Sequence, residues 1–277
     1  MATRVPLADL SVNILKNRPK ASLSKPIKKS KADFSYTENI LMNMKLAEKK
    51  NTLKVNFLLK KNCIDGRERA EVVLWMYEVM WIEKLNDVTR QTAVNILDRT
   101  LQKRSTSSSR IDLVALASIL IAAKLEEVIV PNPTVLIGYP SKRFTLKQLY
   151  RMERIILRLL KFQLIRPTPF CFLEAYFHTT RIDFKDKMQN FSRYLIDLGT
   201  TDQHIATYAP SKIASSALYI MLRKASSKNW WYDEFERVTG YTAEDVEKVI
   251  EPITKLSTSG LKNDFYTFLN NHYKRLL

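Results

Sequence analysis

Apolar residues recur at three- and four-residue spacing along most of the chain, and this spacing is typical of amphipathic helices. In the segment 111–125 they occupy nearly every side of the predicted helix, so we expect this helix to lie at the centre of a bundle. No proline occurs between Pro26 and Pro131, which leaves a long stretch free of the strongest helix breaker. The helices predicted before residue 165 span residues 36–50, 67–82, 89–102, 111–125 and 145–161.

Two segments carry signals for the start of a helix. The serine-rich loop 105–109 is expected to supply the N-cap of the helix 111–125. Thr145 and Gln148 have the spacing of a capping box, in which each side chain accepts a hydrogen bond from the backbone N–H of the other residue. The helix 145–161 is therefore expected to begin at this pair.

The second half of the chain resembles the first when the sequence is shifted by 97 residues. The shift places Phe144-Thr145 on Tyr241-Thr242, and it aligns the apolar stripes of three predicted helices. We therefore expect an all-α fold of two tandem helical units of about 100 residues each, joined near residues 164–168. Residues 1–33 are rich in Lys, Ser and Pro without helical period, which predicts a disordered basic tail.

The chain carries a strong excess of positive charge. Lys and Arg outnumber Asp and Glu by 45 to 28, which gives a net charge of +17 and favours acidic partners or nucleic acid. The two cysteines, Cys63 and Cys171, lie 108 residues apart, so we expect neither a disulfide nor a zinc ribbon. The longest apolar run, residues 113–123, is about half a bilayer span. These features predict a soluble protein of a reducing intracellular compartment, with no membrane contact.

Groups that could carry catalysis do not converge in the sequence. His178, His204 and His272 lack metal-ligand spacing, and no Walker loop, GxGxxG or GxSxG motif is present. The sequence therefore predicts a protein that is not an enzyme and has no cofactor, metal or small-molecule substrate.

Four charged residues lie on otherwise apolar helix faces. Arg69 and Asp98 occupy equivalent inner positions of the first two long helices, and an ion pair between them would hold these helices together. Lys124 ends the apolar helix, where a cation is favoured by the helix dipole. Glu153 has only apolar residues and a tyrosine three and four positions away, so it needs a partner elsewhere in this chain or in another.

These charged residues and their surroundings resemble the cyclin box. The resemblance runs through residues 69–75, 95–99 (NILDR), 120–127 (LIAAKLEE), 149–154 (LYRMER) and 160–162 (LKF). Residues 209–214 (APSKIA) and 239–242 (TGYT) are similar to the C-terminal fold of mitotic A/B-type cyclins, most like the B-type. The five positions that define the box are filled as expected, with their spacing kept, by Arg69, Asp98, Leu113, Lys124 and Glu153.

The resemblance implies two tandem five-helix cyclin folds preceded by an N-terminal helix. It places the regulatory tail at 1–33, the N-terminal helix and linker at 34–55, the N-terminal cyclin box at 56–165 and the C-terminal cyclin fold at 166–277. It further implies a regulatory subunit that forms a heterodimer with a cyclin-dependent serine/threonine kinase and activates it for the G2/M transition, while the chemistry stays with the kinase.

The resemblance also assigns a kinase-binding surface. In the family, the residues that match Lys124 and Glu153 bind backbone groups of the kinase beside its mobile regulatory helix, so we expect the two to meet on one exposed face. Charge-assisted hydrogen bonds of this kind are stronger than neutral ones. The other matching kinase contacts are Leu125, Glu127, Leu157, Phe162 and Leu164 in the box, with Tyr36 and Ile40 in the N-terminal helix.

The substrate-docking patch of the family departs from its usual sequence here. The family segment Met-Arg-Ala-Ile-Leu is replaced by residues 68–72 (ERAEV), so two apolar contacts have become the carboxylates of Glu68 and Glu71. Because each large apolar side chain contributes about 1.5–3 kcal/mol when buried, we expect weak or altered binding of Arg-x-Leu docking peptides. The patch by resemblance comprises Glu68, Val72, Trp75, Glu78 and Leu113.

The basic tail contains two short motifs. Arg4, Leu7, Leu10 and Asn13 resemble a mitotic destruction box read by a ubiquitin ligase, although Asn13 stands one place later than usual. Residues 28–31 (KKSK) could act as a nuclear import signal or as a solvated basic run, so we expect a protein of the nucleus and cytoplasm.

Two alternatives remain open. A transcription factor of the transcription factor IIB type uses the same repeated fold and would account for the charge, but it would have no use for the Lys124/Glu153 pair and would carry zinc-ribbon cysteines. We therefore regard nucleic acid as the less favoured partner. The second alternative is a cyclin-fold scaffold that no longer activates a kinase.

Overall fold

The computed structural model describes residues 31–49, 53–55, 57–58, 64–180, 184–225, 232–260 and 264–276, with side chains from residue 38 to 259 and from 264 to 276 within these ranges. Within this part of the chain every regular element is a helix, so the predicted all-α fold is confirmed. The tail motif of Arg4, Leu7, Leu10 and Asn13, and the basic run up to residue 30, lie outside the described residues.

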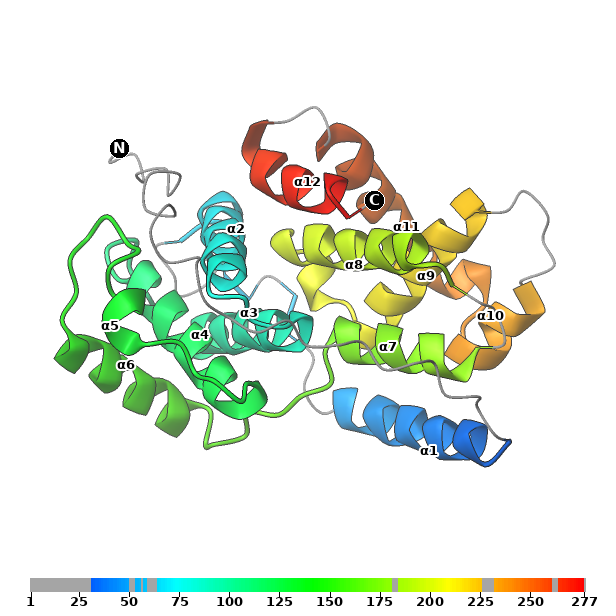
Figure 1. Ribbon diagram of the computed structural model, residues 1–277, viewed down its shortest axis with the longest axis horizontal. Coiled ribbons are helices and arrows are strands. Elements are labelled where there is room, and N and C mark those ends of the chain that lie inside the picture. The colour runs from blue at the N-terminus through cyan, green and yellow to red at the C-terminus, as the bar shows by residue number, and fades with distance from the viewer. Residues whose placement is uncertain are drawn as a thin grey trace.

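The first unit is built around one central helix. All thirteen residues from Ile111 to Ala123 are buried, because this helix is apolar on nearly every side and is covered by its neighbours. It packs most extensively against the helix before it and the last helix of the unit, as Figure 1 shows. The helices of this unit are α2 (Gly66–Ile82), α3 (Asp87–Lys103), α4 (Ile111–Glu126), α5 (Pro133–Leu136) and α6 (Leu146–Leu159).

The second unit repeats this arrangement. The helices α8 and α9 begin 99 residues after α3 and α4, and α11 begins 97 residues after α6, so the shift found in the sequence corresponds to a structural repeat. Two three-residue helical turns, Ile205–Thr207 and Asp264–Tyr266, and a terminal helix add to it. The helices are α7 (Pro169–Thr179), α8 (Asp186–Thr201), α9 (Pro210–Ala225), α10 (Tyr232–Thr239), α11 (Ala243–Gly260) and α12 (Thr267–Lys274).

Of the two helix starts predicted from capping residues, that of α6 is confirmed and that of α4 is not. The capping box at Thr145 and Gln148 is present, with both reciprocal hydrogen bonds formed. The N-cap of α4, however, is Arg110, whose side chain makes no capping hydrogen bond. The prediction that the serine loop supplies the cap was therefore wrong, and the Ser107 and Ser109 hydroxyls bond to each other instead.

The N-terminal helix α1 (Lys31–Glu48) packs along α7 and α9 of the second unit (Figure 1). It starts within the last residues predicted as tail. Its buried end is polar, since the Glu48 carboxylate accepts hydrogen bonds from the backbone N–H and the hydroxyl of Ser211. Lys45 donates to the Thr239 carbonyl from the same face. These contacts fix α1 to the second unit and leave Ile40 partly exposed on the outer side.

A buried arginine joins the two units. Arg69 of α2 forms two parallel hydrogen bonds of 2.7 Å with the Asp98 carboxylate of α3, as the sequence predicted. The same guanidinium donates to the backbone carbonyls of Thr200 and Thr201 at the end of α8, at 3.0 and 2.9 Å. Burial lowers the pKa of Arg69, but the charge and hydrogen bonds of Asp98, together with the nearby Tyr77 and Asp202, outweigh burial in sum, so the pKa is raised. This arginine therefore stabilises both the first unit and its contact with the second.

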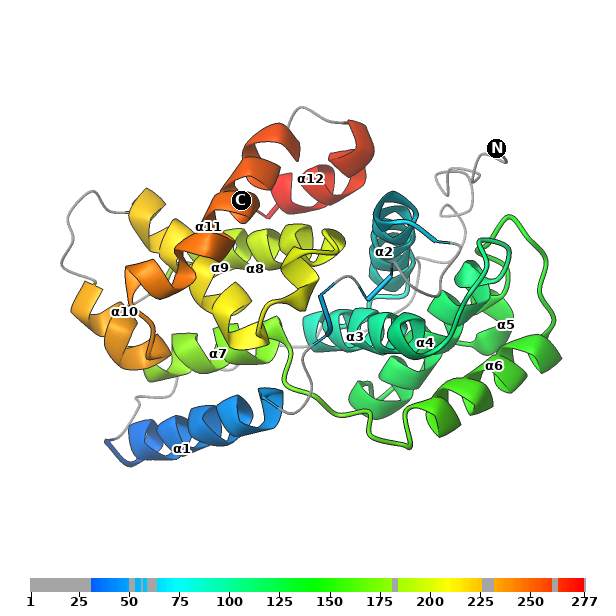
Figure 2. The same ribbon diagram turned by 180° about the vertical axis from the view of Figure 1, so that it is seen from behind.

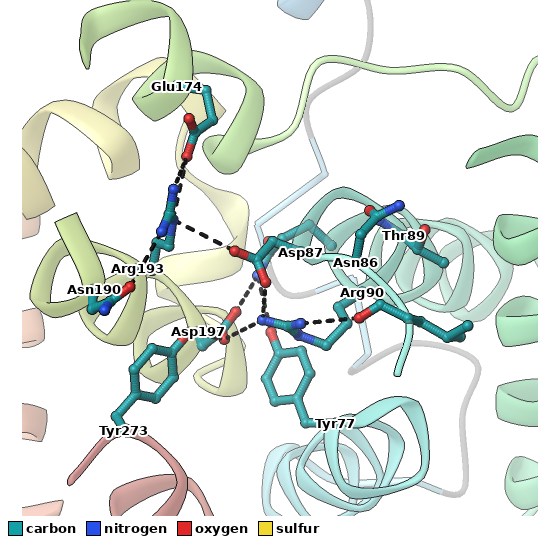
Figure 3. A network of polar contacts seen from close by, with 12 residues as sticks. Tyr77, Asn86, Asp87, Thr89, Arg90, Glu174, Asn190, Arg193, Asp197 and Tyr273 are labelled. Atoms are coloured by element: carbon teal, nitrogen blue, oxygen red, sulfur yellow. Dashed lines mark hydrogen bonds and ion pairs between the residues drawn. The ribbon is translucent and has the colours of Figure 1, made fainter. Parts of the chain in front are cut away.

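A second polar network crosses the same boundary and is drawn in Figure 3. Asp197 of α8 is fully buried and accepts hydrogen bonds from Gln91 of α3 at 2.8 Å and from Tyr273 of α12 at 2.7 Å. Arg90 lies 3.6 Å from the same carboxylate and pairs with Asp87 one turn earlier. The terminal helix is thus connected to the first unit through a satisfied buried carboxylate.

Candidate protein-binding surface

Lys124 and Glu153 come together although they lie on different helices. Lys124 is in the last turn of α4 and Glu153 is in the middle of α6, and Nζ of the lysine lies 2.5 Å from Oε1 of the glutamate. The two helices are held in register because Leu149 and Ile156, one turn on either side of Glu153, are completely buried against the core. The partner that Glu153 requires is therefore Lys124 of the same chain.

The two charges differ in their exposure. The lysine side chain is 45% exposed, whereas the glutamate side chain is only 11% exposed. The expectation of two exposed charges is thus met by Lys124 alone, because apolar residues of α4 and α6 surround Glu153. The ammonium group has three donors and the carboxylate has several acceptor positions, so each retains hydrogen-bonding capacity toward an approaching backbone.

Exposed apolar side chains lie on both sides of this pair. Leu125 follows Lys124 and is 40% exposed, and Phe162 follows α6 and is 68% exposed. Phe162 and the residue before it, Lys161, both have positive φ, a conformation that costs energy in residues other than glycine. Arg99 of α3 stabilises this turn by donating to the carbonyls of Gln163 and Leu164. The turn therefore presents Phe162 on the surface instead of in the core.

Three of the residues predicted as kinase contacts have other surroundings. Leu164 is buried and Leu157 is largely covered by the core, so neither presents a full apolar side chain. Glu127 accepts hydrogen bonds from the backbone N–H of Asn86 at 2.7 Å and from the Thr89 hydroxyl at 2.6 Å. Its observed role is therefore to bind the first turn of α3.

The predicted contacts on the N-terminal helix stay untested. Tyr36 lies in α1 before residue 38, where the structure does not describe side chains. Ile40 is 38% exposed. In Figures 1 and 2, α1 and α6 both run along the lower edge of the molecule, so both helices can be reached from that side.

Several exposed apolar residues were missed from the sequence. Val128 and Ile129 follow α4 and are 101% and 66% exposed, and exposed Ile165 follows α6. The run Val128-Ile129-Val130 directly before Pro131 was a usable signal, because three aliphatic residues beyond a helix end have no helical face to join. Together with Leu125 and Phe162 they lie at or just after the ends of α4 and α6, the two helices that carry Lys124 and Glu153, and exposed apolar residues of this kind are expected at a protein interface.

The predicted docking patch on α2 is mostly covered. Val72 is completely buried and Trp75 and Leu113 are nearly so, because α2 packs against neighbours on both sides. A docked peptide therefore cannot contact Val72, and its assignment as a patch contact was wrong. Glu78 is partly buried, which raises its pKa. Glu68 is engaged by the Ser108 hydroxyl at 3.1 Å.

Within the described residues, no group of three or more histidine, cysteine or acidic side chains is placed to hold a metal ion. His272 stacks on the Trp81 ring at 3.7 Å. Burial and the nearby Arg90 charge lower the pKa of His272 to about 4. Of the helices that are described, none combines the length and apolar character needed to span a bilayer.

Comparison with known families gives two matches that divide the chain between them. Residues 39–165 match the cyclin N-terminal domain, and residues 167–275 match the cyclin C-terminal domain. The chain belongs to the cyclin family. This cyclin is 30% identical over 220 residues to human G2/mitotic-specific cyclin-B2 and 32% identical over 214 residues to human cyclin-A2. These alignments cover 79% and 76% of the chain but 54% and 49% of the relatives, so the chain spans about half their length.

Solved structures agree on the fold. A viral cyclin from herpesvirus saimiri superposes on this cyclin with a TM-score of 0.69 at 19% identity, covering 78% of this chain and 97% of that one. A chain of the yeast RNA Pol II CTD kinase complex matches with a TM-score of 0.52 at 15% identity, covering 86% of this chain and 75% of that one. The tandem arrangement of two cyclin domains is thereby confirmed.

Proposed function

We propose that this cyclin binds a cyclin-dependent serine/threonine kinase and activates it for the G2/M stage of division. The observation that carries the proposal is the Lys124–Glu153 pair, in which a half-exposed lysine lies 2.5 Å from a largely buried glutamate. Exposed Leu125 follows the lysine, and exposed Phe162 follows the helix of the glutamate. One relative is named a G2/mitotic-specific cyclin, and one structural neighbour belongs to a kinase complex. An apolar surround with a few desolvated charges is suited to a stable protein interface.

Activation would proceed as a population shift in the kinase. A free kinase holds its regulatory helix away from the active site, so its catalytic Lys–Glu pair is not formed. Lys124 can donate to carbonyl groups and Glu153 can accept from N–H groups of that helix only when the helix is turned inward. A partner that binds the inward state more tightly shifts the kinase toward it by that difference in affinity. The reacting groups all remain in the kinase.

The test is the double variant Lys124→Ala/Glu153→Ala. Both charges are removed together because Lys124→Ala alone would leave the largely buried Glu153 without its partner, which would destabilise the fold. The double variant should fold with an unchanged circular dichroism spectrum and lose kinase association in a pull-down and kinase activation in a phosphorylation assay.

A matched control removes another ion pair of the same unit. Arg67 and Glu71 form an exposed pair of 3.5 Å on α2, so Arg67→Ala/Glu71→Ala changes the same charges away from the proposed surface. Kinase binding should survive in this control. Normal binding and activation by the Lys124/Glu153 variant would refute the proposed function.

We further propose that the tail controls turnover and location. Arg4, Leu7, Leu10 and Asn13 would be recognised by a ubiquitin ligase, and the basic residues 28–31 would support import, giving a protein shared between nucleus and cytoplasm. Removal of residues 1–13 should lengthen the half-life after metaphase in a chase experiment. An unchanged decay curve would argue against the destruction motif.

A nucleic-acid-binding function is the second candidate, and the net charge of +17 favours it. Phosphate contacts release counterions, so the affinity of such a protein falls steeply with salt. Filter binding of duplex DNA across salt concentrations, repeated with the Lys124/Glu153 variant, separates the two functions. Tight, salt-dependent DNA binding together with no kinase association would favour the transcription-factor alternative.

A further inference from the structure

The positive charge of this cyclin is concentrated in two segments. Residues 1–31 carry +7 and residues 128–173 carry another +7, so the remaining 200 residues share only +3. Within 128–173 there are eight Lys and Arg residues and one acidic residue, Glu153. Glu153 is paired with Lys124, which lies outside the segment. No acidic residue of the segment is therefore available to neutralise its eight cations.

Most of these cations form one file along the outer side of α6. We call Lys147, Arg151, Arg154, Arg158 and Lys161 the basic stripe. The first four follow one another at spacings of four, three and four residues, which keeps them on one side of the helix, and Lys161 lies in the turn just after α6 ends. From Lys147 to Arg158 the file is about 16 Å long. All five residues are exposed, and α6 forms the outer edge of the first unit in both Figures 1 and 2.

The basic stripe has no counter-charge among the described residues. None of its five members forms an ion pair with a described side chain, although acidic groups occur on the neighbouring helices. Glu126 at the end of α4 lies 3.5 Å from the Thr92 hydroxyl, and Glu127 binds the start of α3. Like charges three and four residues apart on a helix destabilise it by about 0.2–0.5 kcal/mol per pair. The helix thus carries a repulsion that a bound acidic partner would relieve.

We propose that the basic stripe is a docking surface for an extended, Asp/Glu-rich segment of a partner protein. Side chains on one side of an extended chain lie about 6.6 Å apart, close to the axial steps of about 4.5–6 Å between successive cations of the stripe. Arginine contributes three of the five cations, and its planar group binds carboxylates through two parallel hydrogen bonds. Lys124 and Glu153 are not part of the stripe, so binding of such a segment can be measured without a kinase; Phe162, next to the stripe, also belongs to the proposed kinase-binding surface.

Two observations favour a protein over nucleic acid as the occupant. The stripe is bordered by exposed Tyr150 and Phe162, which supply the apolar contacts found at protein interfaces. In addition, the cations form a single file on a convex helix, and the described second unit adds acidic side chains, among them Glu244 and Glu247, instead of continuing a basic surface. A duplex would need phosphate contacts spread over a wider area.

The test measures binding of a fluorescein-labelled twelve-residue peptide of alternating Asp and Glu to the full 277-residue chain by fluorescence anisotropy. A neutral Ser/Gly peptide of the same length, a twenty-nucleotide single-stranded DNA and a duplex of the same sequence are measured in parallel. The variant Arg151→Glu/Arg154→Glu/Arg158→Glu reverses the centre of the stripe. This variant should keep the circular dichroism melting curve of the parent chain, because all three side chains are exposed. The affinity for the acidic peptide should fall at least about tenfold.

A matched control makes the same change of charge elsewhere. Lys187, Lys248 and Lys255 are exposed lysines of α8 and α11, and Lys187→Glu/Lys248→Glu/Lys255→Glu should leave peptide binding within about twofold of the parent chain. Equal weakening by the two variants would show unspecific attraction and overturn the proposal. Tighter stripe-dependent binding of either DNA than of the acidic peptide would overturn it in favour of nucleic acid.

Discussion

Replacement of Arg69 by methionine is expected to destabilise the whole chain. The Arg69 side chain is completely buried, and it donates four hydrogen bonds, two to Asp98 and one each to the carbonyls of Thr200 and Thr201. Methionine fills much of the same volume but provides no charge and no donors. The Asp98 carboxylate, only 3% exposed, would then be left in the interior without its counter-charge.

The size of the effect follows from these contacts. Removing one partner of a buried charge pair costs about 3–5 kcal/mol, and each carbonyl left without a donor adds about 1 kcal/mol or more. The sum is a large share of the 5–15 kcal/mol that typically separates folded from unfolded domains. We therefore expect a fall of about 5–7 kcal/mol in the free energy of unfolding, with the larger part due to the isolated carboxylate.

A double-mutant cycle separates the charge from the packing. In Arg69→Met/Asp98→Leu both charges are absent, and buried ion pairs replaced by apolar residues often lose little stability. The double variant should therefore be more stable than Arg69→Met alone, as measured by urea unfolding followed by circular dichroism and by intrinsic tryptophan fluorescence. Two probes are required because coincident transitions are the test of two-state unfolding.

Two results would refute this reasoning. If Arg69→Met lost less than about 1 kcal/mol, the carboxylate would be solvated or paired elsewhere, against the observed burial. If the double variant were less stable than the single one, packing and not the isolated charge would account for the loss.

Three further predictions concern pH, capping and docking. The pKa of His272 is lowered to about 4 in the folded chain and returns to about 6.5 on unfolding, so the unfolded state binds more protons below pH 6.5. The contribution of neutral His272 to the free energy of unfolding is complete above pH 6.5, and it falls by about 1–2 kcal/mol toward pH 4, after allowance for partial exposure. Urea midpoints should show this loss for the parent chain and not for His272→Phe. An equal loss in both chains would contradict the prediction. Thr145→Ala should lower stability by about 1 kcal/mol by removing the N-cap of α6, measured by thermal melting; an unchanged Tm would contradict the capping role. An ordinary Arg-x-Leu peptide should bind only weakly in calorimetry, because Glu68 and Glu71 replace apolar contacts, and a nanomolar Kd would contradict this.

The candidate surface can be described only from the sequence and the structure together. Its central charge pair could be named from the sequence, since Lys124 and Glu153 stand where the cyclin box places them. That they lie within 2.5 Å of each other depends on the packing of α4 against α6. The consequence for experiment is direct, because only the pairing explains why both residues must be replaced together.

Local patterns were sufficient for much of the fold. Helical spacing located the four long helices of the first unit but not the short α5, and the capping box at Thr145 marked the start of α6 to the residue. The shift of 97 residues revealed the duplication, and the inner positions of Arg69 and Asp98 predicted their ion pair. These features depend on residues close in sequence or on charges that cannot be buried singly, so they are readable without coordinates.

Burial and pairing across the fold were decided by the tertiary structure. Val72 and Leu164 were predicted on exposed surfaces but are buried, and Glu127 is held by α3. Helical spacing shows that two residues share a face; it does not show how many neighbours cover that face. Those neighbours come from helices tens of residues away, so only the packed chain determines which apolar residues remain available to a partner.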